Sequence, residues 1–332
     1  MDVPTHHADQ LAAASKEFGV EGLSEKLAQE SMLDLVFLMD CTGSMGSYIH
    51  SAQQTINRIV EEIVATEKAS VRFGLIGYRD HPPQEDSYVT MIFPFTSSVK
   101  TMREQLDKLN ANGGGDNPEA VADGLHAVLQ LSYRESATRV CLLIADAPPH
   151  GLDASGDTFP DGCPCGFDPI VLCRGMAEAG ITLYCIGCEP SLCPYKSFFM
   201  AMTSITGGQY CALSDATALA SAVVAGVREE ISLERVMREV DAQLDQCGDM
   251  TPEAQAAFIH QKMQERGVTS RHMRAGTQRG GELPTDAARD IQQKRSLAEV
   301  RVNFAKDKVT SSHQKAAYGR SAARSKHTRR TH

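Results

Sequence analysis

The residues with the clearest potential for chemistry are oxygen donors that follow an apolar run at positions 33–39. Directly after this run, Asp40, Thr42 and Ser44 place one carboxylate and two hydroxyls at alternate positions. In a turn that leads into a helix, these three side chains can converge on one small cation. Hard oxygen ligands of this kind suit Mg²⁺, Mn²⁺ or Ca²⁺, and nothing in the set favours Zn²⁺.

Two later segments can contribute to the same site. The apolar run 139–145 ends in Asp146, and three consecutive glycines in the loop 113–120 precede Asp116. Glycines let the backbone of such a loop approach a ligand closely. Ligands of an open parallel sheet bind beyond the carboxyl ends of its strands. We therefore expect Asp146 and Asp40 to face one crevice, with Asp116 beside them.

The rhythm of the sequence predicts the sheet that would position these residues. Short apolar runs alternate with longer amphipathic stretches, which is typical of a parallel sheet covered by helices on both faces. The runs are rich in aliphatic and β-branched residues, as strands buried on both faces should be. The six predicted strands are Leu33–Met39, Val71–Gly77, Val89–Phe93, Arg139–Ala145, Ile181–Ile186 and Gln209–Leu213.

Helical periodicity fills the stretches between the strands. Apolar residues recur on one helical face at 49–63, 102–109 and 121–129, and such faces would cover the sheet. Only residues 78–88 separate the second and third strands, too few for a crossover helix, so the third strand is expected at an antiparallel edge. The predicted fold class is α/β: a doubly wound, mostly parallel six-stranded sheet with one antiparallel edge strand, plus a helical C-terminal extension.

The remainder of the chain is predicted to be helical and then basic. Residues 216–245 have the pattern of one long helix, Thr251 suits the start of a second, and Thr285 is a candidate cap for a last helix ending near Phe304. From His313 onward the chain carries six Lys or Arg and no acid, a composition that favours disorder. The expected organisation is an N-terminal helical or irregular segment at 1–30, an α/β domain at 31–228, a helical extension at 229–304 and a basic tail at 305–332.

Composition limits the class of protein. With 42% hydrophobic and 23% charged residues, the chain has the make-up of a soluble globular protein. No segment reaches the roughly 18 apolar residues that a membrane span needs, and residues 1–10 lack the basic and apolar regions of a secretory signal. Several cysteines lie in apolar runs, where free thiols act as small core residues. We expect a cytoplasmic protein, although the even number of 10 cysteines leaves disulfides open.

The three loops together resemble the metal-ion-dependent adhesion site (MIDAS) of the von Willebrand factor type A family, a Rossmann-like fold. The resemblance rests on Asp-x-Thr-x-Ser at 40–44, on the glycine-rich loop 113–120 and on the strand that ends in Asp146. Further segments at 77–81, 159–162 and 187–190 resemble, more narrowly, the type A domains that accompany atypical alpha-kinases. The residues after 245 are too few for a kinase domain of that kind.

The resemblance implies a module that binds a protein partner and is not an enzyme. In it, Thr42 and Ser44 would hold a divalent cation directly, with Mg²⁺ favoured, while Asp40 and Asp146 act mostly through water. A partner would complete the metal shell with an acidic side chain. Many members of the family have Thr where this chain has Asp116. A direct Asp116 ligand would tighten metal binding and weaken an acidic partner; otherwise Asp116 stays outside the inner shell.

Two alternatives use other chemistry. A metal-dependent hydrolase or phosphotransferase could use the same carboxylates to activate water, but the chain has no phosphate loop, nucleophile elbow or kinase signature. Its candidate bases, His81 and His150, have no partner evident in sequence. A regulatory or scaffold protein could bind through the helical extension and through the basic tail, which suits nucleic acid, acidic protein or anionic lipid.

Two further groups of residues have competing interpretations. Cys163 and Cys165, with His150 and two later cysteines at 188 and 193, could bind zinc, but Cys-x-Cys is not the Cys-x-x-Cys spacing that tetrahedral zinc sites usually use. The sequence favours an inert surface loop over zinc or a redox pair. Asp80 and His81 could shape a ligand surface at the crevice edge. The favoured interpretation there is a structural ion pair between Arg79 and Asp80.

Overall fold

A computed structural model describes residues 32–66, 69–213 and 284–307, together with single residues at 224, 227, 230, 231 and 261. Several predicted segments lie outside the described residues: the N-terminal segment, most of the long helix at 216–245, the helix expected after Thr251 and the basic tail. In the part of the chain that is described, no helix has the length and apolarity to cross a membrane, and all nine cysteines are free thiols.

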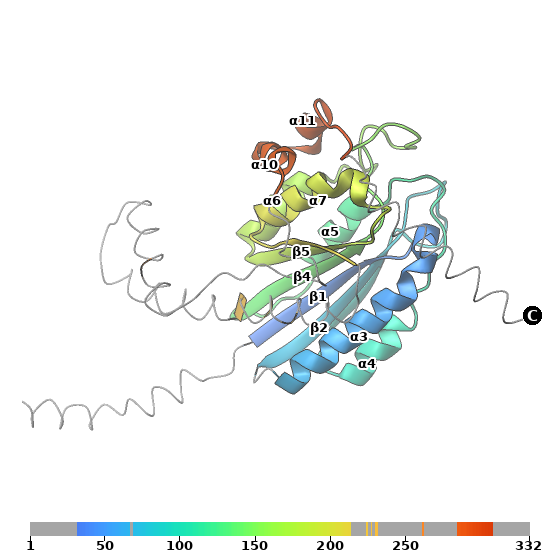
Figure 1. Ribbon diagram of the computed structural model, residues 1–332. Coiled ribbons are helices and arrows are strands. Elements are labelled where there is room, and N and C mark those ends of the chain that lie inside the picture. The colour runs from blue at the N-terminus through green and yellow to red at the C-terminus, as the bar shows by residue number, and fades with distance from the viewer. Residues whose placement is uncertain are drawn as a thin grey trace, which may run out of the picture.

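All six predicted strands are confirmed, and they form one mixed sheet (Figure 1). Its strands are β1 (Met32–Asp40), β2 (Ser70–Tyr78), β3 (Thr90–Thr96), β4 (Ala137–Ala145), β5 (Ile181–Gly187) and β6 (Tyr210–Ala212). They lie in the order β3-β2-β1-β4-β5-β6. The short β2–β3 connection gives the predicted antiparallel edge, and all other neighbours are parallel.

Both faces of the central strands are buried, which is why these strands are mostly apolar. On β1, Leu35 and Phe37 face one layer of helices, whereas Val36 and Leu38 face the other, as the two-residue period of a strand requires. One layer is α3 and α4, and the opposite layer is α5, α6 and α7 (Figure 1). The helices are α3 (Ile49–Thr66), α4 (Val99–Leu106), α5 (Val121–Leu129), α6 (Pro169–Glu178) and α7 (Lys196–Ile205).

Two of these helices have no counterpart in the sequence analysis. Helix α6 begins with Asp168 as its cap, whose side chain accepts from the backbone N–H groups of Ile170 and Val171. Helix α7 is buried from Lys196 to Thr203, so it lacks the one-sided apolar stripe by which a surface helix is predicted. Its outer side is covered by residues from the C-terminal part of the chain.

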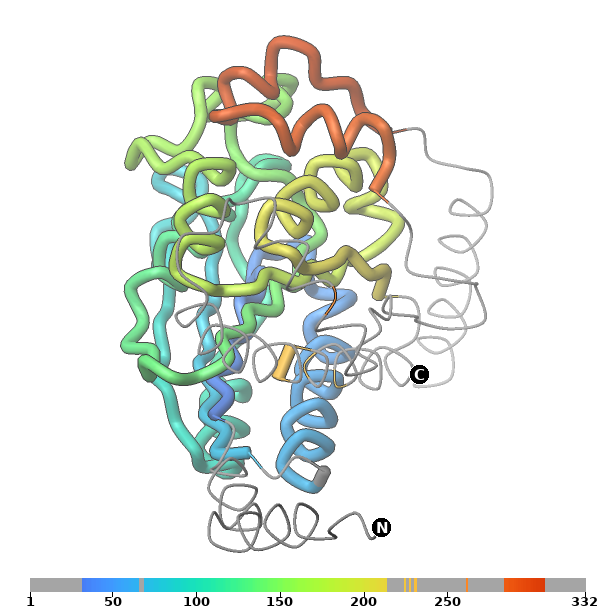
Figure 2. Tube along the Cα trace, turned by 90° about the vertical axis from the view of Figure 1, so that its left-hand side faces the viewer, coloured from blue at the N-terminus to red at the C-terminus, as the bar shows by residue number. Residues whose placement is uncertain are grey.

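The segment 284–307 lies on the outside of this helix layer. Figure 2 shows it beyond α6 and α7, on their side away from the sheet. Its helix α10 packs on α7, and its helix α11 on α6. The apolar side chains that make these contacts include Ala288, Ile291, Leu297 and Val300. This part of the extension is therefore integrated into the α/β domain.

The single helix predicted to run from Thr285 to near Phe304 is wrong in its length. The cap is confirmed, because Thr285 Oγ1 accepts from Ala288 N at 3.0 Å. The helix then breaks at Lys294, whose backbone is extended, giving α10 (Asp286–Gln293) and α11 (Leu297–Arg301). Arg174 stabilises the break, because its Nη2 donates to the Gln292 and Lys294 carbonyl oxygens at 2.9 and 2.6 Å.

The candidate metal residues stand at one edge of the sheet. Because β1 and β4 are adjacent and parallel, with Met39 opposite Ile144, Asp40 and Asp146 leave the sheet side by side. The loops beyond these carboxyl ends gather at one end of the molecule (Figure 1). The fold thus places the residues singled out by sequence where an open parallel sheet binds its ligands.

Candidate metal centre

Four of the five predicted residues are joined by hydrogen bonds. Asp40 Oδ1 accepts from Thr42 N at 2.9 Å and from Thr42 Oγ1 at 2.7 Å. The Thr42 hydroxyl lies 3.1 Å from Ser44 Oγ, which donates to Asp146 Oδ1 at 2.9 Å. The chain of contacts runs from the end of β1 to the end of β4. The structure thus brings Asp40, Thr42, Ser44 and Asp146 into one group.

The loop around these residues is fixed by its backbone. Gly43 N donates to the Gly113 carbonyl at 2.8 Å, and Asn112 N donates to the Cys41 carbonyl at 3.0 Å. A Cβ on Gly43 would lie 3.0 Å from that Gly113 oxygen. Gly113 itself has a φ of +73°, which only glycine adopts without strain. These glycines therefore hold the glycine-rich loop directly against the Asp-x-Thr-x-Ser turn.

Glu119 belongs to this site, although the sequence analysis did not select it. Its side chain is buried, and a Cβ built on Gly114 would lie 2.7 Å from Glu119 Oε1 and 3.2 Å from Thr42 Cβ. Gly114 thus lies close to both the Glu119 carboxyl and Thr42. The sequence hid this role because an acid just before a helix usually serves the helix N-terminus. The only available signal was its place in the glycine-rich loop.

The site concentrates acidic groups away from water. Burial, and then the neighbouring Asp146, raise the pKa of Asp40 to about 7. Burial, followed by the charges of Asp40 and Asp80, raises the pKa of Glu119 to about 11, and burial also raises the pKa of Asp146. Within the described residues, no Lys or Arg forms an ion pair with Asp40, Glu119 or Asp146. Positive charge is what this group lacks.

Two carboxylate oxygens of the site have no hydrogen-bond partner among the described residues. They are Asp40 Oδ2 and Glu119 Oε2, and both are buried. Buried polar atoms are nearly always hydrogen-bonded, so an orphaned pair needs an explanation. A hard divalent cation would satisfy them, because carboxylate and hydroxyl oxygens are its preferred ligands. The residues therefore fit the metal that the sequence analysis expected.

Asp116, the fifth predicted residue, belongs to a neighbouring group. Its Oδ2 accepts from Thr158 N at 2.7 Å. Ligand atoms of Asp116, His150 and Asp157 all lie within 4.8 Å of one another. The structure shows no hydrogen bond from Asp116 to Asp40, Thr42, Ser44 or Asp146 among the described residues. The structure thus places Asp116 apart from the hydrogen-bonded group of the other four residues.

The histidines near the crevice have partners that sequence alone did not reveal. His150 lies between two carboxylates, with Nε2 at 2.6 Å from Asp80 Oδ1 and Nδ1 at 2.8 Å from Asp157 Oδ1. Both ring nitrogens are thus engaged by carboxylates, and although burial lowers the pKa of His150, the two carboxylates raise it overall. With both nitrogens engaged, His150 has none left to accept a proton from a substrate.

The predicted ion pair between Arg79 and Asp80 is wrong. Arg79 turns away from its neighbour: Nη1 lies 3.4 Å from Glu85 Oε2, and Nη2 donates to Asn110 Oδ1 at 2.6 Å. Asp80 instead contacts His150. Consecutive residues at the end of a strand point in opposite directions, so their side chains meet different neighbours.

Comparisons with known proteins agree with this architecture. Residues 34–155 match the family model of the von Willebrand factor A domain. The chain is 34% identical over 155 residues to alpha-protein kinase vwkA of Dictyostelium discoideum, covering 46% of this chain and 24% of that protein. It is 31% identical over 186 residues to the putative ariadne-like RING finger protein R811 of Acanthamoeba polyphaga mimivirus, covering 54% of this chain and 18% of that protein.

A solved von Willebrand factor type A structure from Catenulispora acidiphila also resembles the chain, with a TM-score of 0.43 and 16% identity over 60% of this chain and 43% of that one. The chain spans about a quarter or less of the length of the curated relatives above. By sequence, residues 34–155 thus match a von Willebrand factor A domain.

Proposed function

We propose that this domain is a metal-dependent protein-interaction module that binds its partner through a divalent cation, with Mg²⁺ as the favoured ion and Mn²⁺ or Ca²⁺ as alternatives. Asp40, Thr42, Ser44 and Asp146 would hold the cation. The observation that carries the proposal is the hydrogen-bonded set of hydroxyls and carboxylates with unpartnered buried oxygens on Asp40 and Glu119.

The hydroxyls suit a site that must exchange hydrogen bonds for a cation. Thr42 Oγ1 and Ser44 Oγ each keep lone pairs while they donate to carboxylates, so each can present an oxygen to a metal without moving its backbone. Glu119 would add a third carboxyl beside Thr42. Asp116 would remain outside the inner shell, where its charge still attracts a cation at longer range.

Access to the site supports a partner that approaches from solvent. Asp40, Thr42 and Asp146 are buried, whereas Ser44 and the adjacent Gly43 are exposed. A cation held at this place would therefore be open on the Ser44 side. Its positive charge would favour a carboxylate from the partner as the remaining ligand. With the carboxylates acting mostly through water, the two neutral hydroxyl ligands would leave the cation enough charge for that contact.

The alternative of hydrolysis or phosphoryl transfer has less support. It needs a general base within reach of a bound water, and His150 has both ring nitrogens directed at carboxylates. A scaffold role through the helical extension would need surfaces of residues 284–307, and these residues already pack on α6 and α7. The free cysteines of the described residues support the cytoplasm as the compartment, because disulfides are rare there.

The test is a calorimetric titration of Mg²⁺, Mn²⁺ and Ca²⁺ into the metal-stripped full chain. Asp40→Asn preserves the size of the side chain but removes its charge, so saturable binding should weaken at least about tenfold. Asp86→Asn is the matched control, because Asp86 is an exposed acid outside the site, and it should bind as the unmodified chain does. Equal binding by Asp40→Asn would contradict the proposal.

A second arm tests the partner. Proteins captured from a cell extract in Mg²⁺ should dissociate when a chelator is added and rebind when Mg²⁺ is restored. They should be missing when Asp40→Asn is used as bait and present with Asp86→Asn. Partners that survive chelation and bind Asp40→Asn equally well would show that the domain interacts through a different surface.

A further inference from the structure

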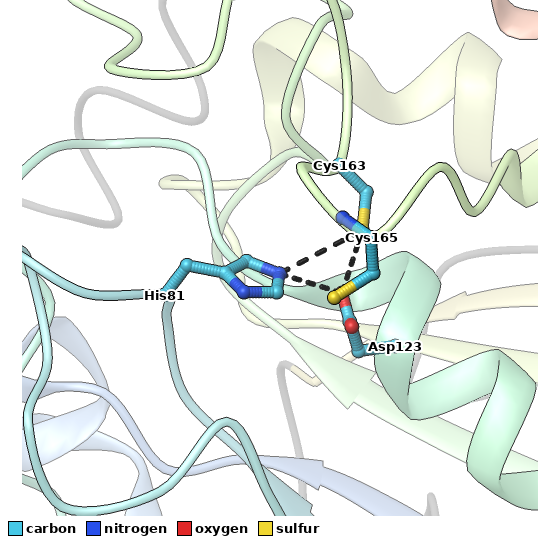
Figure 3. A group of neighbouring side chains, drawn as sticks. All are labelled: His81, Asp123, Cys163 and Cys165. Atoms are coloured by element: carbon cyan, nitrogen blue, oxygen red, sulfur yellow. Dashed lines mark hydrogen bonds and ion pairs between the residues drawn. The ribbon is translucent and has the colours of Figure 1, made fainter.

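A second group of metal-ligating side chains lies away from the candidate site. It consists of His81, Asp123, Cys163 and Cys165, whose ligand atoms all lie within 4.8 Å of one another. Figure 3 shows the four side chains converging from three segments. His81 follows β2, Asp123 lies in the first turn of α5, and the two cysteines lie in the connection from β4 to α6.

The spacing of the donor atoms is close to that of a tetrahedral zinc site. Zinc lies about 2.3 Å from sulfur and about 2.0–2.2 Å from nitrogen or oxygen, which separates tetrahedral ligands by about 3.4–3.8 Å. Cys163 Sγ lies 3.7 Å from His81 Nε2 and 3.1 Å from Asp123 Oδ2, and His81 Nε2 lies 2.9 Å from the same oxygen. Shifts of about half an ångström would accommodate the ion.

Backbone N–H groups of the loop are directed at the sulfur of Cys163. Cys165 N donates to Cys163 Sγ at 3.3 Å, and the backbone N–H of Phe167 also interacts with that sulfur. Gly166 N closes the turn by donating to the Cys163 carbonyl at 2.9 Å. Hydrogen bonds donated to a ligand sulfur stabilise its charged form and fix its direction. The loop thus fixes the direction of the Cys163 sulfur, while burial raises the pKa of its thiol to about 12.

The charge balance separates this group from the one around His150. There, an imidazole contacts Asp80 and Asp157 through both nitrogens, so its own positive charge balances the carboxylates. Asp123 is buried and contacts His81 through one nitrogen only. Within the described ranges, no Lys or Arg forms an ion pair with Asp123. The buried carboxylate beside two thiols therefore has only the His81 imidazole near it as a possible cation among the described residues.

We propose that His81, Asp123, Cys163 and Cys165 form a structural zinc site. Two sulfurs, one imidazole and one carboxylate are a ligand set that suits Zn²⁺ and does not suit Mg²⁺. Four protein ligands close the coordination shell, which is typical of a structural rather than a catalytic site. Cys165 is exposed, and this gives the ion a route in from solvent.

This ligand set differs from the one weighed in the sequence analysis. Cys163 and Cys165 are grouped with His81 and Asp123, and not with His150 or the cysteines at 188 and 193. The Cys-x-Cys spacing is compatible with zinc here because the other two ligands come from the segment after β2 and from α5. A zinc ion would tie the connection between β4 and α6 to both of these elements. It would thereby fix the loop that also carries His150 and Asp157.

Cobalt substitution of the full-length chain, prepared under reduction, tests the proposal directly. One equivalent of Co²⁺ should give the visible absorption of a tetrahedral ion and a sulfur-to-cobalt charge-transfer band, and Zn²⁺ should displace it. The oxygen-only site at Asp40 cannot produce the charge-transfer band, so Asp40→Asn should leave the spectrum unchanged. Absence of that band in the unmodified, folded chain would overturn the proposal.

Zinc content provides the second measurement. Elemental analysis of the purified chain should find one tightly held zinc, retained in Asp40→Asn and in the matched control Cys193→Ser, and lost in the Cys163→Ser, Cys165→Ser double variant. The single variant Cys165→His should still hold one equivalent of metal. Its charge-transfer band should be weaker, because one sulfur ligand is replaced by nitrogen. Equal zinc in the double variant and the unmodified chain would overturn the assignment of these ligands.

Discussion

Ser44 Oγ donates a 2.9 Å hydrogen bond to Asp146 Oδ1, which joins residues 102 positions apart. The contact exists because β1 and β4 are parallel neighbours whose ends meet at one edge of the sheet. It completes a chain of hydrogen bonds that begins at Asp40. The four side chains are therefore held close to one another before any ion binds. This lowers the entropic cost of ordering them when an ion binds.

Removal of the Ser44 hydroxyl should weaken metal binding. Ser44→Ala deletes one proposed ligand and frees Asp146 from its hydrogen bond, so the affinity for Mg²⁺ should fall about tenfold or more. Ser51→Ala is a suitable control, because Ser51 is exposed on α3. Calorimetry of both variants measures the difference. Unchanged affinity in Ser44→Ala would show that this hydroxyl does not bind the ion.

Glu119→Gln should reduce the number of protons released when the metal binds. Because burial and nearby acids raise the pKa of Glu119 to about 11, its carboxyl is protonated at neutral pH in the metal-free protein. A cation beside it would displace that proton, whereas glutamine has none to lose. Titrations in two buffers with different ionisation enthalpies measure the released protons. The same release in both proteins would place Glu119 outside the metal shell.

The stability of the metal-free domain should fall as the pH rises through about 7. Burial and Asp146 raise the pKa of Asp40 from 3.8 to about 7, so the folded state binds this proton more tightly than the unfolded state does. The resulting stabilisation is complete below about pH 4 and is lost as Asp40 ionises. Denaturant unfolding at several pH values measures it. Asp40→Asn should flatten this part of the profile, and Mg²⁺ should reverse the loss.

Asp34 should give the opposite dependence on pH. Burial raises the pKa of Asp34, but hydrogen bonds from Arg72 and Arg134 outweigh this and lower it below 3.8 overall. A lowered pKa in the folded state means that stability is present above pH 3.8 and is lost as the pH falls below it. Asp34→Asn should therefore destabilise the domain by about 3 kcal/mol at pH 7.

The same unfolding experiment with Asp107→Asn provides the control for Asp34, since Asp107 is an exposed acid. It should change the free energy of unfolding by less than about 0.5 kcal/mol. A similar small change in Asp34→Asn would mean that the buried pairs with Arg72 and Arg134 contribute little. The pH profile distinguishes this case. If the pairs are weak, Asp34→Asn should lose as much stability at acid pH as the unmodified chain does.

The sequence predicted what depends on local patterns. The strands were predicted because burial on both faces makes them continuous apolar runs, and Asp40 and Asp146 were selected because an acid directly after such a run leaves the sheet at its ligand-binding edge. The antiparallel edge was predicted from the length of one connection. These features are encoded within a few neighbouring residues, so they can be found without knowledge of the tertiary structure.

The parts that were missed depend on contacts between distant segments. His81 and Cys163 are 82 positions apart, and nothing near either residue indicates the other. Asp123 resembles any acid in the first turn of a helix. Helix α7 lacks an amphipathic pattern because residues 284–307 cover its outer side. In each case the information lies in the packing of elements and not in the local sequence.

Asp168 should link the C-terminal extension to the domain. Its Oδ1 accepts from Ile170 N at 2.8 Å as the cap of α6, and its Oδ2 accepts from Leu297 N at 2.7 Å at the start of α11. Asp168→Ala removes both bonds, so it should cost about 1–2 kcal/mol and increase hydrogen exchange in α11. Asp290→Ala, on the exposed side of α10, is the control. If exchange in α11 stays equally slow in both variants, the apolar contacts of Leu297 and Val300 alone hold the extension, and Asp168 serves only α6.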